Sequence, residues 1–526
     1  MQVITVEDLK RTLRSGEELA LLDLREEGAF AKEHLLLARC FPLSRVELIA
    51  RSLLPRRSVP IVVMDDGDGR LAEQGAARLA ELGYGDISLL SGGLAAWRDA
   101  GYEVFSGVNV PSKAFGEFVE ITYGTPRLPA EEVKAMADAG ADMVILDSRP
   151  FDEYRHMNIP GGIDTPGAEL VHRLADLAPN PETAVVVNCA GRTRSIIGCQ
   201  SLVNAGIPNP VYALKDGTMG WHLAGFDLER GQDRVAPAPS AEAVRTAQER
   251  AAQVAVRFGV RTIDSAILAD WQAEAEDRSL YLLDVRTPEE FLAGHLPGSV
   301  SAPGGQLVQA TDEYVAVLNA RLVLIDDNGV RARMTASWLQ QMGWRDAVVL
   351  ENGLSGALET GLALRRLPAI PEALQAATVS LAEFQGMRER AAPMVLDLAS
   401  SLAFRDGHIP GAVWASRAAL PELGSATEVV VTGDDLDLCR FAAADLLRRE
   451  SVVPVRMLEG GNAAWRAAGL PLESGGPTEA DPQDVWYKPY DQVSSIEDHM
   501  RAYLSWEVAL VEQMERDPDL VFKRYD

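Results

Sequence analysis

A short phrase that occurs four times constrains the fold of this chain more than any other feature. Each copy is an apolar run ending in Leu-Asp, with an aromatic residue seven positions and a His or Asn eleven positions after the Asp. A Gly-containing phrase closes each copy, 64 to 70 residues after the Asp. The four pairs are Leu22-Asp23, Leu146-Asp147, Leu283-Asp284 and Leu396-Asp397. A layout this constant predicts four tandem units of one fold.

Each unit alternates apolar runs with segments of helical pattern. The apolar run in the middle of each unit reads as a buried strand, and the four runs are Ile61–Val63, Val185–Val187, Leu322–Ile325 and Val429–Val431. Strands that alternate with helices predict a parallel sheet with helices on both faces, so the fold class is α/β.

Turn-rich and Pro-rich segments separate the units and predict their limits. We expect four domains, a connector helix over 236–258 and a helical tail over 479–526. The four domains are 1–108, 109–235, 259–370 and 371–478. Apolar residues of the tail recur at helical spacing, which predicts that one face of the tail packs on a neighbouring domain.

The net charge of −27 excludes several classes of partner. A diffuse negative field repels phosphate backbones and anionic membranes, so we expect neither nucleic acid nor membrane partners. The four cysteines show no CxxC spacing, and no secretory signal or membrane-spanning run is apparent. We therefore expect a soluble protein of the reducing cytoplasm. A small anionic substrate requires a local basic site.

One loop differs from its three counterparts. After the middle strand, the other units carry Asp65, Asp326 or Gly433 in acid-rich loops, whereas the second unit carries Cys189. This thiol is followed by Ala190, Gly191, Arg192, Thr193, Arg194 and Ser195. Backbone N–H groups at a helix start and two guanidiniums favour a thiolate and can bind an anion. Cys189 is the candidate nucleophile, with Arg149 as a further substrate-binding residue.

The other candidate groups have simpler structural interpretations. Cys40, Cys199 and Cys439 are expected to be small buried hydrophobic residues. A Cys–His pair is not supported, because the His of the repeated phrase occurs in units that lack the nucleophile. For the same reason Asp147 is expected to be structural.

Together these phrases resemble the rhodanese superfamily. The resemblance rests on Leu146–Arg149, Ile159–Gly161, Cys189–Ser195 and Leu214–Trp221 with their counterparts, and covers about residues 1–475. It implies four tandem rhodanese-like domains, each with a parallel five-stranded sheet flanked by helices. It further implies a sulfurtransferase in which Cys189 carries a persulfide and residues 190–195 form its cradle. Tandem pairing in the family suggests that unit one braces unit two, while units three and four form a second pair.

The resemblance also implies the reactants. The sulfur donor is thiosulfate or a related persulfide donor, and the acceptor is cyanide or a thiol, with a protein sulfur acceptor also open. No metal or organic cofactor is required. Units one, three and four lack the Cys and are expected to be inactive.

Two other functions stay open from the sequence. The chain can be a persulfide carrier or scaffold that relays sulfur from Cys189 to a protein partner without turnover. A cysteine phosphatase is the more distant alternative, because such enzymes place an Arg six positions after the Cys, where this chain has Ser195. Arg194 falls five positions after Cys189, which makes a tighter loop suited to a single sulfur atom.

Overall fold

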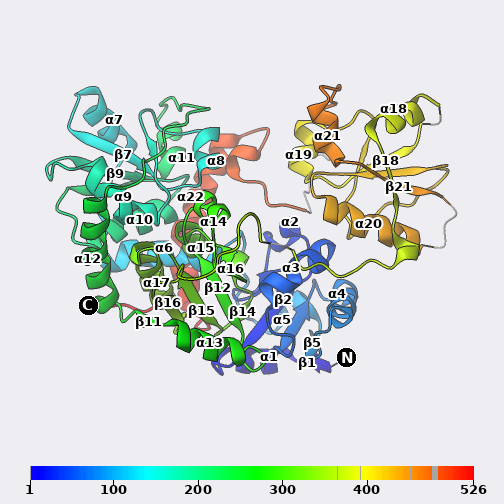
Figure 1. Cartoon of the computed structure of the whole chain (residues 1–526), viewed down its shortest axis with the longest axis horizontal. Coiled ribbons are helices and arrows are strands. Elements are labelled where there is room, and N and C mark those ends of the chain that lie inside the picture. The colour runs from blue at the N-terminus through cyan, green and yellow to red at the C-terminus, as the bar shows by residue number, and fades with distance from the viewer. Residues whose placement is uncertain (1, 364, 391, 450–452, 477–483, 526) are drawn as a thin grey trace.

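The computed structural model describes residues 2–363, 365–390, 392–449, 453–476 and 484–525 (Figure 1). Within these residues the chain forms four sheets, one in each repeated unit. The order across the sheet is the same in every unit. It runs from the first strand to the closing strand, then to the middle strand, the Leu-Asp strand and a short strand that follows the Leu-Asp strand in sequence. The five strands of each unit run parallel, which confirms the predicted α/β fold with four tandem units.

Unit one has a sheet in which the Leu-Asp strand is buried along its whole length. Its strands are β1 (Gln2–Ile4), β2 (Leu19–Asp23), β3 (Arg39–Cys40), β4 (Ile61–Met64) and β5 (Ile87–Leu90). Its helices are α1 (Val6–Leu13), α2 (Glu27–Phe30), α3 (Val46–Leu53), α4 (Arg70–Glu81) and α5 (Gly93–Asp99).

Unit two carries the divergent loop and begins with an additional helix, α6 (Val110–Tyr123). Its strands are β6 (Arg127–Leu128), β7 (Met143–Asp147), β8 (Ile163–Asp164), β9 (Ala184–Asn188) and β10 (Val211–Leu214). Its other helices are α7 (Ala130–Asp138), α8 (Phe151–His156), α9 (Glu169–Leu177), α10 (Thr193–Asn204) and α11 (Gly217–Leu223). The connector helix α12 (Ala241–Arg257) follows.

Unit three contributes one strand to another sheet. Its strands are β11 (Arg261–Ile263), β12 (Leu280–Asp284), β13 (Val300–Ser301), β14 (Val317–Leu318), β15 (Arg321–Ile325) and β16 (Ala347–Leu350). Its helices are α13 (Ser265–Ala273), α14 (Pro288–Ala293), α15 (Gly304–Gln309), α16 (Thr311–Tyr314) and α17 (Val330–Gln341). Strand β14 pairs antiparallel with β2 of unit one, so the first sheet has six strands.

Unit four and the tail complete the described chain. The strands of unit four are β17 (Ala377–Val379), β18 (Met394–Asp397), β19 (Val413–Trp414), β20 (Val429–Thr432) and β21 (Val455–Leu458). Its helices are α18 (Leu381–Arg390), α19 (Ser401–Asp406), α20 (Leu436–Arg448) and α21 (Gly461–Ala467). The tail forms one long helix, α22 (Ile496–Arg516). Figure 1 shows unit four at one side and α22 in the body formed by the first three units.

The units do not associate in two consecutive pairs. Buried apolar residues of units one and three form one continuous core, which also takes in Phe115 of α6 and Ile196 of α10. Unit four packs against unit one instead, where Arg417 forms an ion pair with Glu47 and Leu48 enters the core of unit four. The expected pairing of units three and four is therefore wrong.

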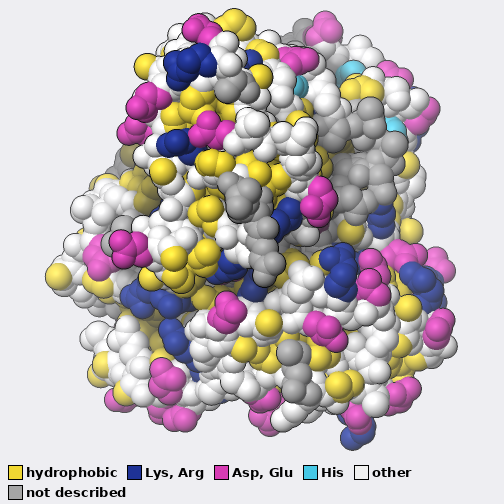
Figure 2. Space-filling view, turned by 90° about the vertical axis from the view of Figure 1, so that its right-hand side faces the viewer, with side chains coloured by type: hydrophobic (Ala, Val, Ile, Leu, Met, Phe, Trp, Pro, Cys, Tyr) yellow, Lys and Arg dark blue, Asp and Glu magenta, His cyan; other side chains and the backbone are white. Residues whose placement is uncertain are grey.

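The excess of acidic side chains is spread over the one face of the molecule that Figure 2 draws. On the face shown in Figure 2, Asp and Glu side chains are scattered among Lys and Arg. Among the described residues no helix is both long enough and apolar enough to cross a bilayer.

Candidate active site

Cys189 lies in a buried loop between strand β9 and helix α10. Only 2% of the residue is exposed. Its Sγ lies 3.4 Å from Ser195 Oγ, and the Ser195 hydroxyl donates to the Arg192 carbonyl oxygen at 2.8 Å. Because the single hydroxyl proton of Ser195 is used in that bond, the thiol of Cys189 is the donor to Ser195 Oγ.

The counterparts of Cys189 show what this position can hold. Asp65 also follows its middle strand directly, and its carboxylate accepts backbone N–H groups of Gly67, Gly69, Leu71 and Ala72 at 2.9 to 3.2 Å. Asp326 accepts the N–H groups of Gly329 and Ala332 in the same way. The loops of units one and three are thus anion cradles that their own carboxylates fill.

The structure brings Arg192 into the loop but pairs its charge fully. Its guanidinium donates to Glu117 at 2.6 and 2.7 Å, to Glu120 at 2.5 Å and to Asp216 at 2.9 Å. Glu117 and Glu120 belong to α6, and Asp216 precedes α11. Arg192 therefore fastens the loop to two neighbouring helices.

Arg194 is paired as well, and it connects two units. Its Nη1 and Nη2 donate to Glu153 Oε1 and Oε2 at 2.9 and 2.8 Å, and Nη1 also donates to Gln306 Oε1 of unit three at 3.0 Å. Burial alone would raise the pKa of Glu153, but the Arg194 guanidinium lowers it to about 2. The two guanidiniums that the sequence predicted to bind an anion are therefore both held in ion pairs with carboxylates of the chain.

Arg149 is directed to a neighbouring carboxylate. Its Nε and Nη2 donate to Asp147 at 2.8 and 2.7 Å, and Nη2 also donates to the Met157 carbonyl oxygen at 2.6 Å. The same pair recurs as Arg25 with Asp23 and as Arg286 with Asp284, in units without the thiol. These contacts brace the end of β7, as the structural interpretation of Asp147 expects, and substrate binding by Arg149 stays a prediction.

Helix α22 of the tail covers the loop. A Cβ on Gly191 would stand 3.1 Å from Glu507 Oε2 and 3.3 Å from a ring carbon of Tyr503. Met500 and Leu504 form an apolar cluster with Ala190 and Met219. The tail thus packs on unit two, as its apolar face predicted, and it closes the loop that carries Cys189.

Burial decides the protonation of Cys189. Burial raises the pKa of this thiol, the Arg194 guanidinium lowers it, and the Glu507 charge raises it further. The expectation that the loop favours a thiolate does not hold for this closed state, because the desolvation of the sulfur outweighs the nearby cation.

Several residues of the site were not anticipated from the sequence. Lys113 of α6 is buried, with its Nζ 4.8 to 5.2 Å from the ring centroids of Trp486, Tyr503 and Trp506. Burial lowers the pKa of Lys113 to about 8. Lys113, Glu117 and Glu120 are spaced so that all three lie on one face of α6. This spacing is the sequence pattern from which a charged face toward the site could have been predicted.

The closing phrase of the repeat supports the loop from another side. At Gly217 a Cβ would lie 2.3 Å from the Cys189 carbonyl oxygen, and the N–H of Thr218 donates to that same oxygen at 2.8 Å. Gly93 and Gly461 make the corresponding close approaches to Asp65 and Gly433. This contact explains the glycine of the repeated phrase in units one, two and four. In unit three a Cβ on Gly353 would meet the Ile325 side chain at 2.9 Å instead.

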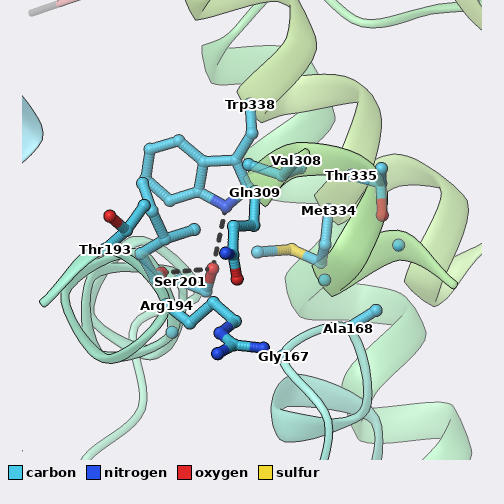
Figure 3. Close-up of a pocket in the computed structure, with 14 residues that line it drawn as sticks. Gly167, Ala168, Thr193, Arg194, Ser201, Val308, Gln309, Met334, Thr335 and Trp338 are labelled. Atoms are coloured by element: carbon cyan, nitrogen blue, oxygen red, sulfur yellow. Dashed lines mark hydrogen bonds between the residues drawn. The ribbon is translucent and has the colours of Figure 1, made fainter. Parts of the chain in front are cut away.

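A small cavity of about 30 Å³ lies behind the loop, where unit two meets unit three (Figure 3). It is lined by Thr193 and Arg194 on one side and by Gln309 and Met334 on the other. Trp338 Nε1 donates to Ser201 Oγ at 2.8 Å across this junction. The cavity is the size of a water site. A larger cavity of about 590 Å³ at the same junction shares Gly167, Ala168, Gly304 and Gly305 with it. Within the described residues, no group of three or more His, Cys, Asp and Glu is arranged to hold a metal.

Comparisons with known proteins show what the chain is similar to. The model of the rhodanese-like domain matches residues 5–100, 129–224, 267–360 and 380–468. A crystal structure of thiosulfate sulfurtransferase from Pseudomonas aeruginosa is 51% identical, covers 100% of both chains and superposes with a TM-score of 0.92.

Two curated proteins match over shorter stretches. An HTH-type transcriptional regulator, Rv0324, of Mycobacterium tuberculosis is 32% identical over 100 residues, which are 19% of this chain and 43% of that protein. A tRNA uridine(34) hydroxylase of Xanthomonas oryzae pv. oryzae is 30% identical over 105 residues, 19% of this chain and 42% of that protein. The chain spans less than half the length of these two relatives.

Proposed function

The chain belongs to the rhodanese-like domain family and is a rhodanese-type sulfurtransferase, and from this premise we propose its reactants and its nucleophile. Cys189 takes the sulfane sulfur of thiosulfate as a persulfide and passes it to a small thiophilic acceptor, such as cyanide or a thiol. We place the reaction in the reducing cytoplasm, with units one, three and four inactive and with domain limits at 108, 235, 258, 370 and 478.

The contact of the Asp65 carboxylate with four backbone N–H groups is the observation that carries this proposal. Cys189 stands at the same place, directly after its middle strand and before a helix. A loop of this type stabilises negative charge at its centre without any side-chain cation. In unit two that charge is a thiolate or a persulfide anion.

The chemistry then proceeds in two displacements. The Cys189 thiolate attacks the outer sulfur of thiosulfate, a new S–S bond forms, and the old S–S bond breaks with its electron pair leaving on sulfite. The acceptor then attacks the outer sulfur of the persulfide, and the electron pair of that bond returns to Cys189. The loop N–H groups stabilise the anion in both steps, and we expect ping-pong kinetics.

The covered position of Cys189 favours small substrates over a protein acceptor. A cavity of about 430 Å³ between unit two and the tail is lined by Tyr490 and Met500, and Met500 also packs with Ala190. We propose this cavity as the entry route, since it reaches the cover of the loop. A protein acceptor requires α22 to move, so the carrier function is second.

The test is the Cys189→Ser variant. We expect it to abolish sulfite release from thiosulfate and to remove the sulfur adduct of about 32 Da that mass spectrometry detects on the wild type. Cys199→Ser, in the following helix, is the matched control and should keep both. Normal sulfite release from Cys189→Ser would contradict the proposal. Loading without turnover, until a protein acceptor is added, would favour the carrier.

A further inference from the structure

A buried carboxyl group from the tail lies against the loop of the nucleophile. Glu507 is 2% exposed and belongs to α22, outside the four segments that match the family model. Its Oε1 accepts from Tyr503 Oη at 2.9 Å and from Thr193 Oγ1 at 3.3 Å. Its Oε2 has no hydrogen-bond partner among the described residues. This free atom is also the one that approaches Gly191.

An orphaned carboxylate oxygen in a buried place requires an explanation. Buried polar atoms are nearly always hydrogen-bonded, because an unpaired one costs about 1–3 kcal/mol. Two hydroxyl donors fix Oε1, and so they direct Oε2 toward the loop that carries Cys189. The arrangement holds one acceptor open beside Gly191, two residues from Cys189.

Charged groups from each neighbouring element face this carboxyl group. Lys113 and Glu117 approach from α6, Arg192 from the Cys189 loop and Tyr503 from α22 itself. Burial raises the pKa of Glu507, while Lys113 lowers it. Cys189 lies close enough for the Glu507 charge to raise the pKa of the thiol. A carboxylate whose pKa is raised accepts a proton from a thiol more readily than an ordinary glutamate does, because the two pKa values are closer.

The reaction requires a proton to leave Cys189 and to return. The resting thiol must lose its proton before sulfur attacks sulfur, and a thiol acceptor must lose its own proton in the second step. Cys189 is 2% exposed and α22 packs against Gly191 beside it, so a group inside the cover is well placed to carry that proton.

We propose that Glu507 is the acid–base residue of this site, an inference that rests on the proposed function. In the first step the carboxylate takes the proton of Cys189 Sγ and gives it to the departing sulfite, which leaves as bisulfite. In the second step the carboxylate takes the proton of the acceptor thiol, and it returns this proton to Cys189 Sγ when the acceptor persulfide leaves. Each step conserves protons and electrons without an added oxidant or reductant.

The test compares Glu507→Gln with the wild type in single-turnover loading from thiosulfate between pH 6 and pH 10. Gln keeps an acceptor for Tyr503 and Thr193 but removes the base. We expect loading to slow by about 10²-fold at pH 7 and to recover as pH rises, because hydroxide then removes the thiol proton. Glu515→Gln, an exposed glutamate of the same helix, is the matched control and should load normally.

A second variant separates acid–base chemistry from folding. Tyr503→Phe keeps the carboxylate but removes one donor, which makes Glu507 more basic, so the pH profile of loading should move upward without a large loss of rate. A Glu507→Gln profile parallel to that of the wild type would overturn the proposal, as would an unmoved profile in Tyr503→Phe. Failure of the wild type to form the Cys189 persulfide would contradict the proposed function instead.

Discussion

Arg194 and Glu153 form a two-bond ion pair beside the Cys189 loop, with Nη1–Oε1 and Nη2–Oε2 distances of 2.9 and 2.8 Å. Glu153 belongs to α8, and the third partner of the guanidinium, Gln306, belongs to unit three. The pair therefore joins the loop to a helix of its own unit and to the neighbouring unit.

Glu153→Gln should lower stability at neutral pH and not at low pH. The pKa of Glu153 is lowered to about 2 in the folded chain, so its stabilisation is complete above the ordinary glutamate pKa and is lost as pH falls from about 4.5 toward 2. We expect a loss of about 1–3 kcal/mol at pH 7, the usual cost of leaving a buried donor without its acceptor, and a difference from wild type that shrinks below pH 4. Urea unfolding at both pH values measures it. An equal loss at pH 7 and pH 3 would contradict the ion-pair explanation, and Asp152→Asn, at an exposed site of the same helix, is the control.

Gly217→Ala should lower the reactivity of Cys189 by shifting its loop, although the Cys189 side chain itself is unchanged. The added Cβ would lie 2.3 Å from the Cys189 carbonyl oxygen and 2.7 Å from that of Gly191, so the loop must shift. Gly225→Ala is the control, because it adds a methyl group at a similarly positive φ with nothing within 4 Å. It therefore has the conformational strain of a positive φ without a steric clash. We expect persulfide loading to fall at least tenfold in Gly217→Ala, roughly the loss that misplacement of reacting atoms causes, and to persist in Gly225→Ala. Equal loading in the two variants would show that the close contact is unimportant.

Asp65→Ala should open an empty anion site in unit one. Backbone N–H groups that the carboxylate now satisfies lose their acceptor, and we expect a destabilisation of about 2 kcal/mol. Formate, a free carboxylate, should then raise the Tm of the variant more than that of the wild type. Asp68→Ala, at an exposed position of the same loop, provides the control. If formate acts equally on all three proteins, the loop is not an anion cradle.

Asp164→Asn should flatten the dependence of stability on pH. Burial is the largest cause that raises the pKa of Asp164 to about 8, and Oδ1 has no partner among the described residues. The unfolded chain therefore loses this proton near pH 4 and the folded chain only near pH 8, so stability falls as pH rises through that window. The variant should gain in Tm over the wild type from pH 5 to pH 9, whereas exposed Asp233→Asn should not. A constant Tm difference across this range would refute the assignment.

The repeat made the fold predictable, because four copies compared with one another identify which positions belong to strands and which loop departs. Cys189 was found in this way, since Asp65, Asp326 and Gly433 stand at the same place. The residues that contact the Cys189 loop could not be identified by comparing the four copies. Lys113 and Glu507 lie in segments without a counterpart in the other units, and only the folded chain shows that Arg192 meets three carboxylates.

The cover of the nucleophile has a consequence for biosynthesis. Glu507 follows Thr193 by 314 residues, so a ribosome makes the reactive loop long before it makes the helix that encloses it. During that interval the thiol is open to oxidants and to any passing electrophile. Synthesis of α22 therefore sets the moment at which this cysteine becomes covered, and a chain that stops before α22 would display a sulfur that the folded molecule conceals.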